Sequence, residues 1–321
     1  MNQKNPSPLT KSRLEPPPPH WVSRAAFPVV VLVFFLDEAA LGTAVYLGFV
    51  WIAVLLALVA SHLMHGIMIG FHEASHGLLR KNRRVNEADG VIIGIFSFMS
   101  FSLYRAAHQL HHAYLATERD IELWPFAIPG TPRWARIFAA MLELGLGLFY
   151  SPCLFLRAFL QDGSPIRNKK LRRRIWAELA LIVVVWFCIL AAVTWWGGWK
   201  YFLWMYLAPA LLAADMQSWR KYIEHVGLTG STVNGSTRSI VSKGPLGWLV
   251  AFTLLHEPYH GVHHRHAGLP HAELPRHTSE LEPVTPDEIS PFRSYRHALM
   301  HLLGSLGDPR VGAQWRTAAQ L

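Results

Sequence analysis

The stretch AALGTAVYLGFVWIAVLLALVASHLMHGIMIGFHEASH, residues 39–76, decides the fold of this chain. Its part up to residue 71 contains no Asp, Glu, Lys or Arg. As one straight helix, that charge-free part would be about 50 Å long, whereas the hydrocarbon core of a bilayer is about 30 Å thick. The stretch therefore predicts parts of two membrane helices rather than one.

We place a first membrane span at residues 24–41, a turn near Gly42 and Thr43, and a second span at residues 46–70. The acidic pair Asp37-Glu38 then lies near the far interface. The second span returns the chain to the side of the membrane on which it began.

A second hairpin is expected further along the chain. Residues 179–199 again lack the four charged residue types, Gly197-Gly198 offers a turn, and residues 201–219 return. The apolar stretches 91–104 and 144–156 are too short to cross a bilayer, so they predict interfacial or re-entrant segments.

The composition is that of a membrane protein. Apolar residues make up 51% and charged residues 16% of the chain, against about a quarter charged in soluble domains. Cys153 and Cys188 have no Cys-x-x-Cys partner, so we expect buried packing residues and neither a disulfide nor a thiolate metal site. We divide the chain into a Pro-rich disordered cytoplasmic tail at 1–23, one membrane domain at 24–277 and a C-terminal cytoplasmic tail at 278–321.

Basic residues set the predicted orientation. They cluster at Arg80-Lys81 with Arg83-Arg84, at 167–174 and at Arg220-Lys221. By the positive-inside rule these clusters face the cytoplasm, and two hairpins with both termini inside satisfy all of them. The run 167–174 is expected to face lipid headgroups, so we predict no nucleic-acid partner. The expected fold is an all-α membrane protein with four transmembrane helices in two hairpins, interfacial helices and a cytoplasmic cap that carries histidine motifs.

Three histidine motifs lie on the predicted cytoplasmic side. Box one is His72-Glu73-Ala74-Ser75-His76, box two is His108-Gln109-Leu110-His111-His112, and box three is His260-Gly261-Val262-His263-His264. Spacings of three and four residues put the imidazoles of each box on one face of a helix. Imidazole is the commonest metal ligand, and eight of them exceed the four that one zinc ion takes. The boxes therefore suit two metal ions with open positions.

Residues outside the boxes extend this predicted site. His225 follows the second hairpin closely and is a ninth ligand candidate. Asp120 and Glu224 are candidates to accept the second ring N–H of a ligating His. His256 is expected to support the site or the local structure, because Pro258 disfavours a continuous helix into box three.

Other metal chemistries remain open at this point. Box one also matches the His-Glu-x-x-His pattern of zinc hydrolases, with Glu73 as the general base. That reading, and haem held by paired His, leave both His-x-x-His-His motifs unexplained. A non-catalytic metal carrier is a further class, which metal identity and stoichiometry would separate. Outside these interpretations, Glu73 and Glu257 are also candidates to accept the second ring N–H of a ligating His, but for both we favour an ordinary solvated carboxylate.

The three boxes at the ends of two membrane hairpins resemble those of the integral-membrane fatty acid desaturase superfamily, over roughly residues 45–275. Arg105 before box two, Asp120 after it and the Pro-bounded run 267–275 are similar to bacterial acyl desaturases. Many desaturases carry an Asn shortly before box three, where this chain has His256-Glu257-Pro258-Tyr259. The segment 222–228 resembles membrane alkane monooxygenases, and the superfamily also includes carotenoid oxygenases.

The resemblance implies a non-haem di-iron centre that activates O₂. Its implied ligands are His72, His76, His108, His111, His112, His225, His260, His263 and His264. The implied substrate is a lipid or fatty acyl chain in an integral membrane protein. We expect desaturation of that chain, with hydroxylation as the alternative.

Electrons are expected from a separate ferredoxin or cytochrome b5-type protein, because the chain has no Cys cluster, His-Pro-Gly-Gly motif or flavin-type glycine fingerprint. Four aromatic residues are available to line an apolar channel: Trp51, Phe71, Phe101 and Trp248.

Overall fold

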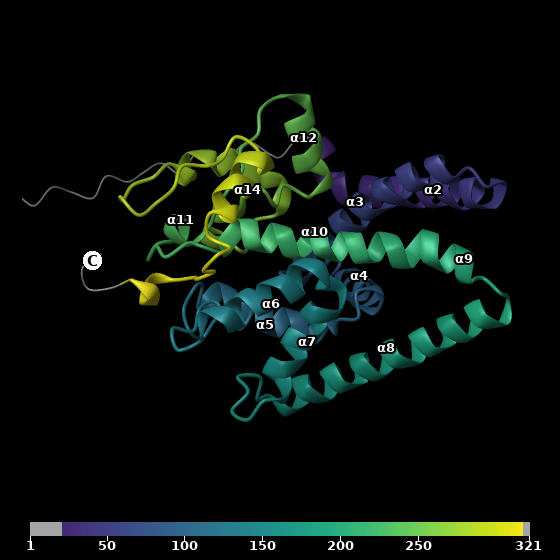
Figure 1. Ribbon diagram of the computed structural model, residues 1–321, viewed down its shortest axis with the longest axis horizontal. Helices are drawn as coiled ribbons and strands as arrows, with labels where there is room; N and C mark the ends of the chain where they lie inside the picture. The colour runs from purple at the N-terminus through teal and green to yellow at the C-terminus, as the bar shows by residue number, and fades with distance from the viewer. Residues whose placement is uncertain (1–20, 317–321) are drawn as a thin grey trace, which may run out of the picture.

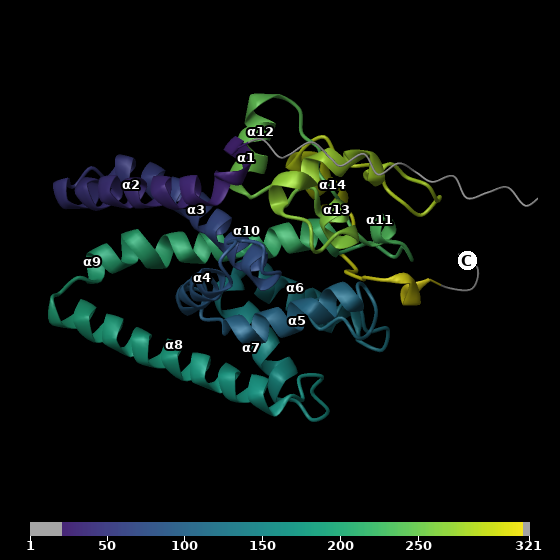
Figure 2. The same ribbon diagram turned by 180° about the vertical axis from the view of Figure 1, so that it is seen from behind.

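The computed structural model describes residues 21–316, so most of the predicted tail at 1–23 lies outside the described residues. The described chain is helical, and its one β-bridge is an isolated pair between Ile240 and Phe292. The elements (Figures 1 and 2) are α1 (Trp21–Arg24), α2 (Ala26–Leu47), α3 (Val50–Ser75), α4 (Arg83–Phe96), α5 (Phe101–Ala113), α6 (Arg133–Gly145), α7 (Gly147–Leu160), α8 (Lys169–Trp195), α9 (Trp199–Phe202), the π-helical η1 (Leu203–Leu207), α10 (Ala208–His225), α11 (Val233–Ser236), α12 (Gly244–Thr253), α13 (His260–Arg265), the 3₁₀ segment η2 (His271–Leu281), α14 (Tyr295–Leu303) and the 3₁₀ turn η3 (Ala313–Trp315).

The first predicted hairpin is α2 and α3, which lie side by side in both views. The turn predicted at Gly42-Thr43 is wrong, because α2 continues to Leu47. The hydroxyl of Thr43 donates a hydrogen bond to the carbonyl oxygen of Ala39, one turn earlier in the helix, at 2.8 Å. The chain turns at Gly48, whose φ of 77° is a left-handed conformation that glycine adopts without strain.

This longer α2 also corrects the placement of its two acids. Asp37 and Glu38 lie in the middle of the helix rather than near a membrane interface. Asp37 is buried, and Glu38 lines an apolar cavity between α2 and α3. The predicted span ends at residue 41, six residues before the end of α2, and this early end placed both acids near an interface.

The second hairpin turns where predicted, at Gly197 with a φ of 64°. Helix α8 precedes the turn, and α9, η1 and α10 follow it without a gap. Both views show α4 to α7 between α10 and α8 (Figures 1 and 2).

Three of the described helices, α2, α3 and α8, are long and apolar enough to cross a membrane, and the bent pair α4–α5 raises the number to four if it counts as one span. The chain is thus an all-α integral membrane protein, while the crossing at 201–219 stays a prediction.

The two short apolar stretches, 91–104 and 144–156, each contain a corner between two helices and are not single segments. Helices α4 and α5 meet at 100°, and α6 and α7 meet at Leu146. Gly94 allows the first corner because the carbonyl of Met99 lies 2.4 Å from where a Cβ would stand. Ser100 then caps α5 by accepting from Leu103 N at 3.2 Å. This corner directs α5, with box two, back under α3.

Two features of the surface differ from the simplest interpretation of the sequence. Arg220, counted among the basic flanks, is buried and ion-paired to Glu224, and Lys221 is ion-paired to Glu143. Cys153 and Cys188 are exposed rather than buried, and both are free.

The segment predicted as a C-terminal tail at 278–321 contacts the helical body in its described part. Ala298, Leu302 and Val311 are buried in one cluster with Tyr222 and Val226 at the end of α10. The division into a domain at 24–277 and two tails stays a prediction.

Candidate metal centre

Four elements deliver the nine candidate histidines to one place. Box one lies at the end of α3, with His76 as its C-terminal cap. Box two occupies the last two turns of α5, and box three forms α13. His225 is the last residue of α10. His112 and His263 are 151 residues apart in the chain, yet their Nε2 atoms lie 3.1 Å apart.

The first cluster contains five imidazoles. Its members come from all three boxes, and their ligand atoms lie within 4.8 Å of one another: His72, His76, His108, His112 and His263. Three Nε2–Nε2 contacts run through the cluster, from His76 to His108 at 3.0 Å, from His108 to His112 at 3.1 Å and from His112 to His263 at 3.1 Å.

The second cluster contains the other four, His111, His225, His260 and His264. His225 and His260 face each other with Nε2 atoms 2.9 Å apart, and His260 and His264 do so at 3.0 Å. The clusters adjoin, since the rings of His112 and His264 stack at a centroid distance of 4.4 Å.

The facing nitrogens fit a bound cation. His225 Nδ1 donates to Ser236 O at 3.1 Å, and His260 Nδ1 donates to Glu257 Oε1 at 2.9 Å. These two hydrogen bonds keep the proton of each neutral ring on Nδ1. Both Nε2 atoms therefore carry a lone pair, and two lone pairs that face each other at 2.9 Å repel. Metal–imidazole bonds of about 2.1 Å at right angles separate two nitrogens by about 3.0 Å, so one cation accounts for both the spacing and the orientation.

Eight of the nine imidazoles are held in the neutral, metal-binding form. His111 is the exception: burial disfavours its charged form, but the charges of Asp120 and Glu122 outweigh burial and raise the pKa of His111 to about 9. Burial lowers the pKa of His76 to about 4, with a smaller contribution from the His111 charge. Burial also lowers the pKa of His263 to about 4, against the opposing charge of Glu257. His260 and His264 have a pKa well below the ordinary value for the same main reason. Neutral rings bind a metal without first releasing a proton.

Carboxylates orient the rings from behind. Asp120, proposed from the sequence, accepts from His111 Nδ1 at 2.8 Å. Glu122, which the sequence reasoning missed, accepts from His108 Nδ1 at 2.9 Å. Its position two residues after Asp120 was the available signal, because both acids lie on the loop that follows box two.

The expectation that Glu257 is a solvated carboxylate is wrong. It is fully buried between the clusters, with Oε1 on His260 and Oε2 3.4 Å from His72 Nδ1. Arg220 donates to Glu257 at 3.1 Å and to both oxygens of Glu224 at 2.6 and 2.7 Å. Glu224 itself lies 3.6 Å from His260 Nε2, close enough to act as a metal ligand.

His256 is buried but turns away from the two clusters. Its Nδ1 lies 3.2 Å from His271 Nδ1, so its hydrogen-bond partner is outside the nine. Leu255 and His256 both have a positive φ, 48° and 57°, a strained conformation for residues with a Cβ. This backbone bend sets Glu257 between the clusters, so the segment supports the site through its backbone.

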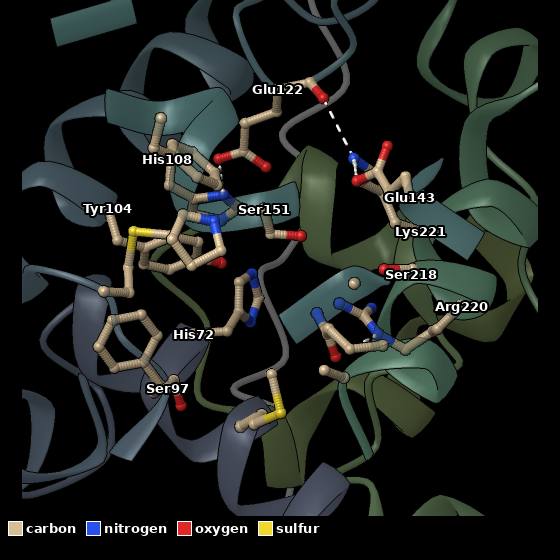
Figure 3. A pocket seen from close by; sticks show the side chains of 18 of the residues that line it. His72, Ser97, Tyr104, His108, Glu122, Glu143, Ser151, Ser218, Arg220 and Lys221 are labelled. Atoms are coloured by element: carbon tan, nitrogen blue, oxygen red, sulfur yellow. Dashed lines mark hydrogen bonds and ion pairs between the residues drawn. The ribbon is translucent and has the colours of Figure 1, made fainter. Parts of the chain in front are cut away.

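The clusters line a small cavity that adjoins a larger apolar one. The smaller, about 100 Å³, has His72, His108 and His225 on its wall. Figure 3 shows His72, His108 and Tyr104 facing Arg220, Lys221 and Ser218 across it. The larger, about 520 Å³, lies between α2, α3, α4 and α10 and shares Met68, Ser97 and Leu148 with the smaller.

Of the four aromatic residues predicted to line a channel, two lie at or beside the smaller cavity and two face outward. Phe71 lines the smaller cavity, and Phe101 packs on Phe71 at a centroid distance of 5.5 Å. Trp51 and Trp248 are 82% and 51% exposed, so they face outward instead.

Comparison with known proteins agrees with this site. The sequence model described as fatty acid desaturase matches residues 49–296, which include all three boxes and His225. An sn-1 acyl-lipid omega-3 desaturase (ferredoxin) from Synechocystis sp. is 22% identical, with 78% of this chain and 74% of the relative covered. The family uses a di-iron centre, which the histidine clusters are suited to hold. This chain belongs to the fatty acid desaturase family.

Proposed function

We propose that this protein is an O₂-dependent di-iron oxidoreductase that desaturates a fatty acyl chain within the membrane. The observation that carries the proposal is that Nε2 atoms of different histidines face each other in both clusters. The clearest case is His225 and His260, whose Nε2 atoms lie 2.9 Å apart while both Nδ1 atoms donate their protons to other acceptors. A single-zinc hydrolase would use only box one and would leave these contacts unexplained.

In this proposal the two clusters divide the metal ions between them. The first cluster would hold one iron ion and the second cluster the other, with Glu224 available as an oxygen ligand. Asp120, Glu122 and Glu257 keep the ring protons on Nδ1, so that each Nε2 points at a metal.

The cavities suggest how a lipid reaches the centre. The larger cavity is walled mostly by apolar side chains of α2, α3 and α10, among them Val31, Ile67 and Ala213. An acyl chain that enters from the bilayer would lie there and reach the metal centre past Met68 and Leu148. Burial of the chain excludes water from the reacting carbon and fixes its position relative to the clusters.

The chemistry follows from what the bound metal supplies. A di-iron pair, when bound, supplies the reduction of O₂ and the removal of hydrogen from an unactivated carbon. In desaturation the substrate and the donor each give two electrons, and O₂ with four protons becomes two waters. Because the chain lacks a recognisable redox motif, we assign the donor electrons to a separate ferredoxin or cytochrome b5-type protein. The relative is itself named as ferredoxin-linked.

We propose that the histidine centre faces the cytoplasm, where such a donor is found. The argument is the positive-inside rule applied to the exposed residues Lys81, Arg83, Arg84 and Arg173.

One observation favours hydroxylation as a second candidate. Ser218 is buried on the wall of the smaller cavity, and its hydroxyl has no partner there. A product hydroxyl would find a hydrogen-bond partner at that position, whereas an alkene would not.

Lipid analysis decides between the two outcomes. Cells that express the protein receive a perdeuterated saturated fatty acid under heavy-isotope O₂, beside cells that express His263→Ala. Desaturation gives a product that lacks two deuterons and carries no labelled oxygen. A labelled alcohol without an alkene would replace desaturation with hydroxylation, and identical lipids in both cultures would refute the proposed activity.

A further inference from the structure

A separate group of metal-binding side chains lies on the surface beyond box three. His266 Nε2 lies 2.7 Å from Glu280 Oε2, and His277 Nδ1 lies 2.8 Å from Glu280 Oε1. The two rings are 5.4 Å apart, and one donor atom from each of the three residues lies within 4.8 Å of the others. None of the three belongs to the nine histidines of the centre.

The backbone holds these three side chains in place. His266 caps the end of α13, while His277 and Glu280 lie three residues apart in η2. Val262 of α13 and Leu274 and Leu281 of η2 form one buried cluster beneath them.

A further hydrogen bond fixes the position of Glu280. Asn234 donates to the backbone carbonyl of Glu280 at 2.9 Å. Since the donors are positioned by packed elements, a bound cation would need little further ordering of the chain.

We propose that His266, His277 and Glu280 form a second metal site that binds one divalent cation of the zinc class. Two imidazoles and a carboxylate, with a fourth position open to water, are a ligand set that zinc accepts. Each imidazole nitrogen lies 2.7 or 2.8 Å from an oxygen of Glu280. Donors about 2.1 Å from one cation lie roughly 3 Å apart, so these two distances are close to those of a bound cation.

The site differs from the histidine-box centre in its access to solvent. The side chains of His266 and Glu280 are 42% and 34% exposed, so the cation would exchange with solvent, unlike one held among buried rings. A cation at this site ties the end of α13 to η2, two residues beyond His264. It would thereby restrain the helix that carries box three.

Zinc binding to the iron-loaded protein in detergent tests the site. Equilibrium dialysis against Zn²⁺ should find one zinc per chain in addition to iron. The affinity should fall at least tenfold in His277→Gln and in Glu280→Gln, and it should be unchanged in His297→Gln, whose histidine is exposed on α14. No zinc beyond the iron, or equal zinc binding by Glu280→Gln, would overturn the proposal.

A spectrum of the unaltered protein keeps the test decisive if a variant misfolds. Zinc-edge X-ray absorption of the iron-loaded protein with one equivalent of zinc should show two imidazoles and oxygen ligands. A shell of four imidazoles would mean that zinc had entered the histidine boxes, and the surface site would be refuted.

Discussion

Replacement of Glu257 by Gln removes a buried charge that joins the two histidine clusters. Its Oε1 accepts from His260 Nδ1 at 2.9 Å and from Arg220 at 3.1 Å, while its Oε2 lies 3.4 Å from His72 Nδ1. The amide keeps one acceptor oxygen and puts an NH₂ donor in place of the other. Whichever way the amide turns, the Nδ1 of one of the two rings then faces an NH₂ group instead of a carboxylate oxygen.

The structure sets the size of the effect. Arg220 keeps both oxygens of Glu224 at 2.6 and 2.7 Å, so its charge is not left unpaired. The loss of stability should then be that of one charged hydrogen bond, about 1.5–3 kcal/mol. Loss of a residue that orients a ligating His typically lowers metal affinity roughly 10–100-fold, which equals about 1.4–2.8 kcal/mol.

The assay measures iron per chain and the rate at which a coloured chelator removes iron at neutral pH. Glu257→Gln should release iron at least tenfold faster than the unaltered protein, because the ring it no longer orients binds more weakly. Glu118→Gln, an exposed carboxylate near box two, serves as the matched control and should match the unaltered protein. Normal iron content and a normal release rate in Glu257→Gln would refute the reasoning. A lower melting temperature with normal iron content would mean that Glu257 stabilises the fold but does not contribute to metal binding.

Three other predictions concern the cavity, pH and topology. Ala213 is fully buried on the wall of the larger cavity, so Ala213→Phe should shorten the acyl chain that the protein accepts. Each excluded methylene should cost about 0.8 kcal/mol of binding, which is roughly a fourfold loss in kcat/KM. Product profiles across chain lengths measure this effect, and a profile equal to that of the exposed control Ala191→Phe would contradict the prediction. In the metal-free protein the pKa of His76 and of His263 is about 4, against 6.5 in the unfolded chain, so the unfolded chain binds more protons between these pH values. The melting temperature should therefore fall as the pH drops from about 6.5 towards 4. A melting temperature that stays constant over this pH range would be inconsistent with buried neutral rings. With Cys153 and Cys188 replaced by Ser, a cysteine at Gly198 should react with an impermeant reagent from outside and a cysteine at Lys170 only after permeabilisation, and the reverse pattern would invert the proposed orientation.

The helical membrane architecture and the grouping of the histidines could be predicted from the sequence. Long charge-free stretches need a bilayer, and spacings of three and four residues put the imidazoles of one box on one helix face whatever surrounds it. Asp120 was predictable for a similar reason, because it follows box two closely and bonds His111 within the same local segment.

Helix ends and corners were less predictable. The hydropathy of α2 does not distinguish Gly42 inside the helix from Gly48 at its end. The difference depends on contacts with a distant part of the chain: a Cβ at Gly42 would meet Met205 of η1, 163 residues away, at 3.2 Å. Composition placed Arg220 with the basic flanks, whereas the tertiary structure buries it among Glu224 and Glu257.

By itself, the sequence determined that this is a helical membrane protein with three histidine boxes suited to metal, because periodicity and hydrophobicity are local properties of the chain. Only the tertiary structure decided which imidazoles share a cluster, that Glu257 joins His72 to His260, and that Glu122 supports His108. The same holds for the surface group of His266, His277 and Glu280. These are contacts between segments whose separation in the chain carries no information about their distance in space, and packing alone brings them together.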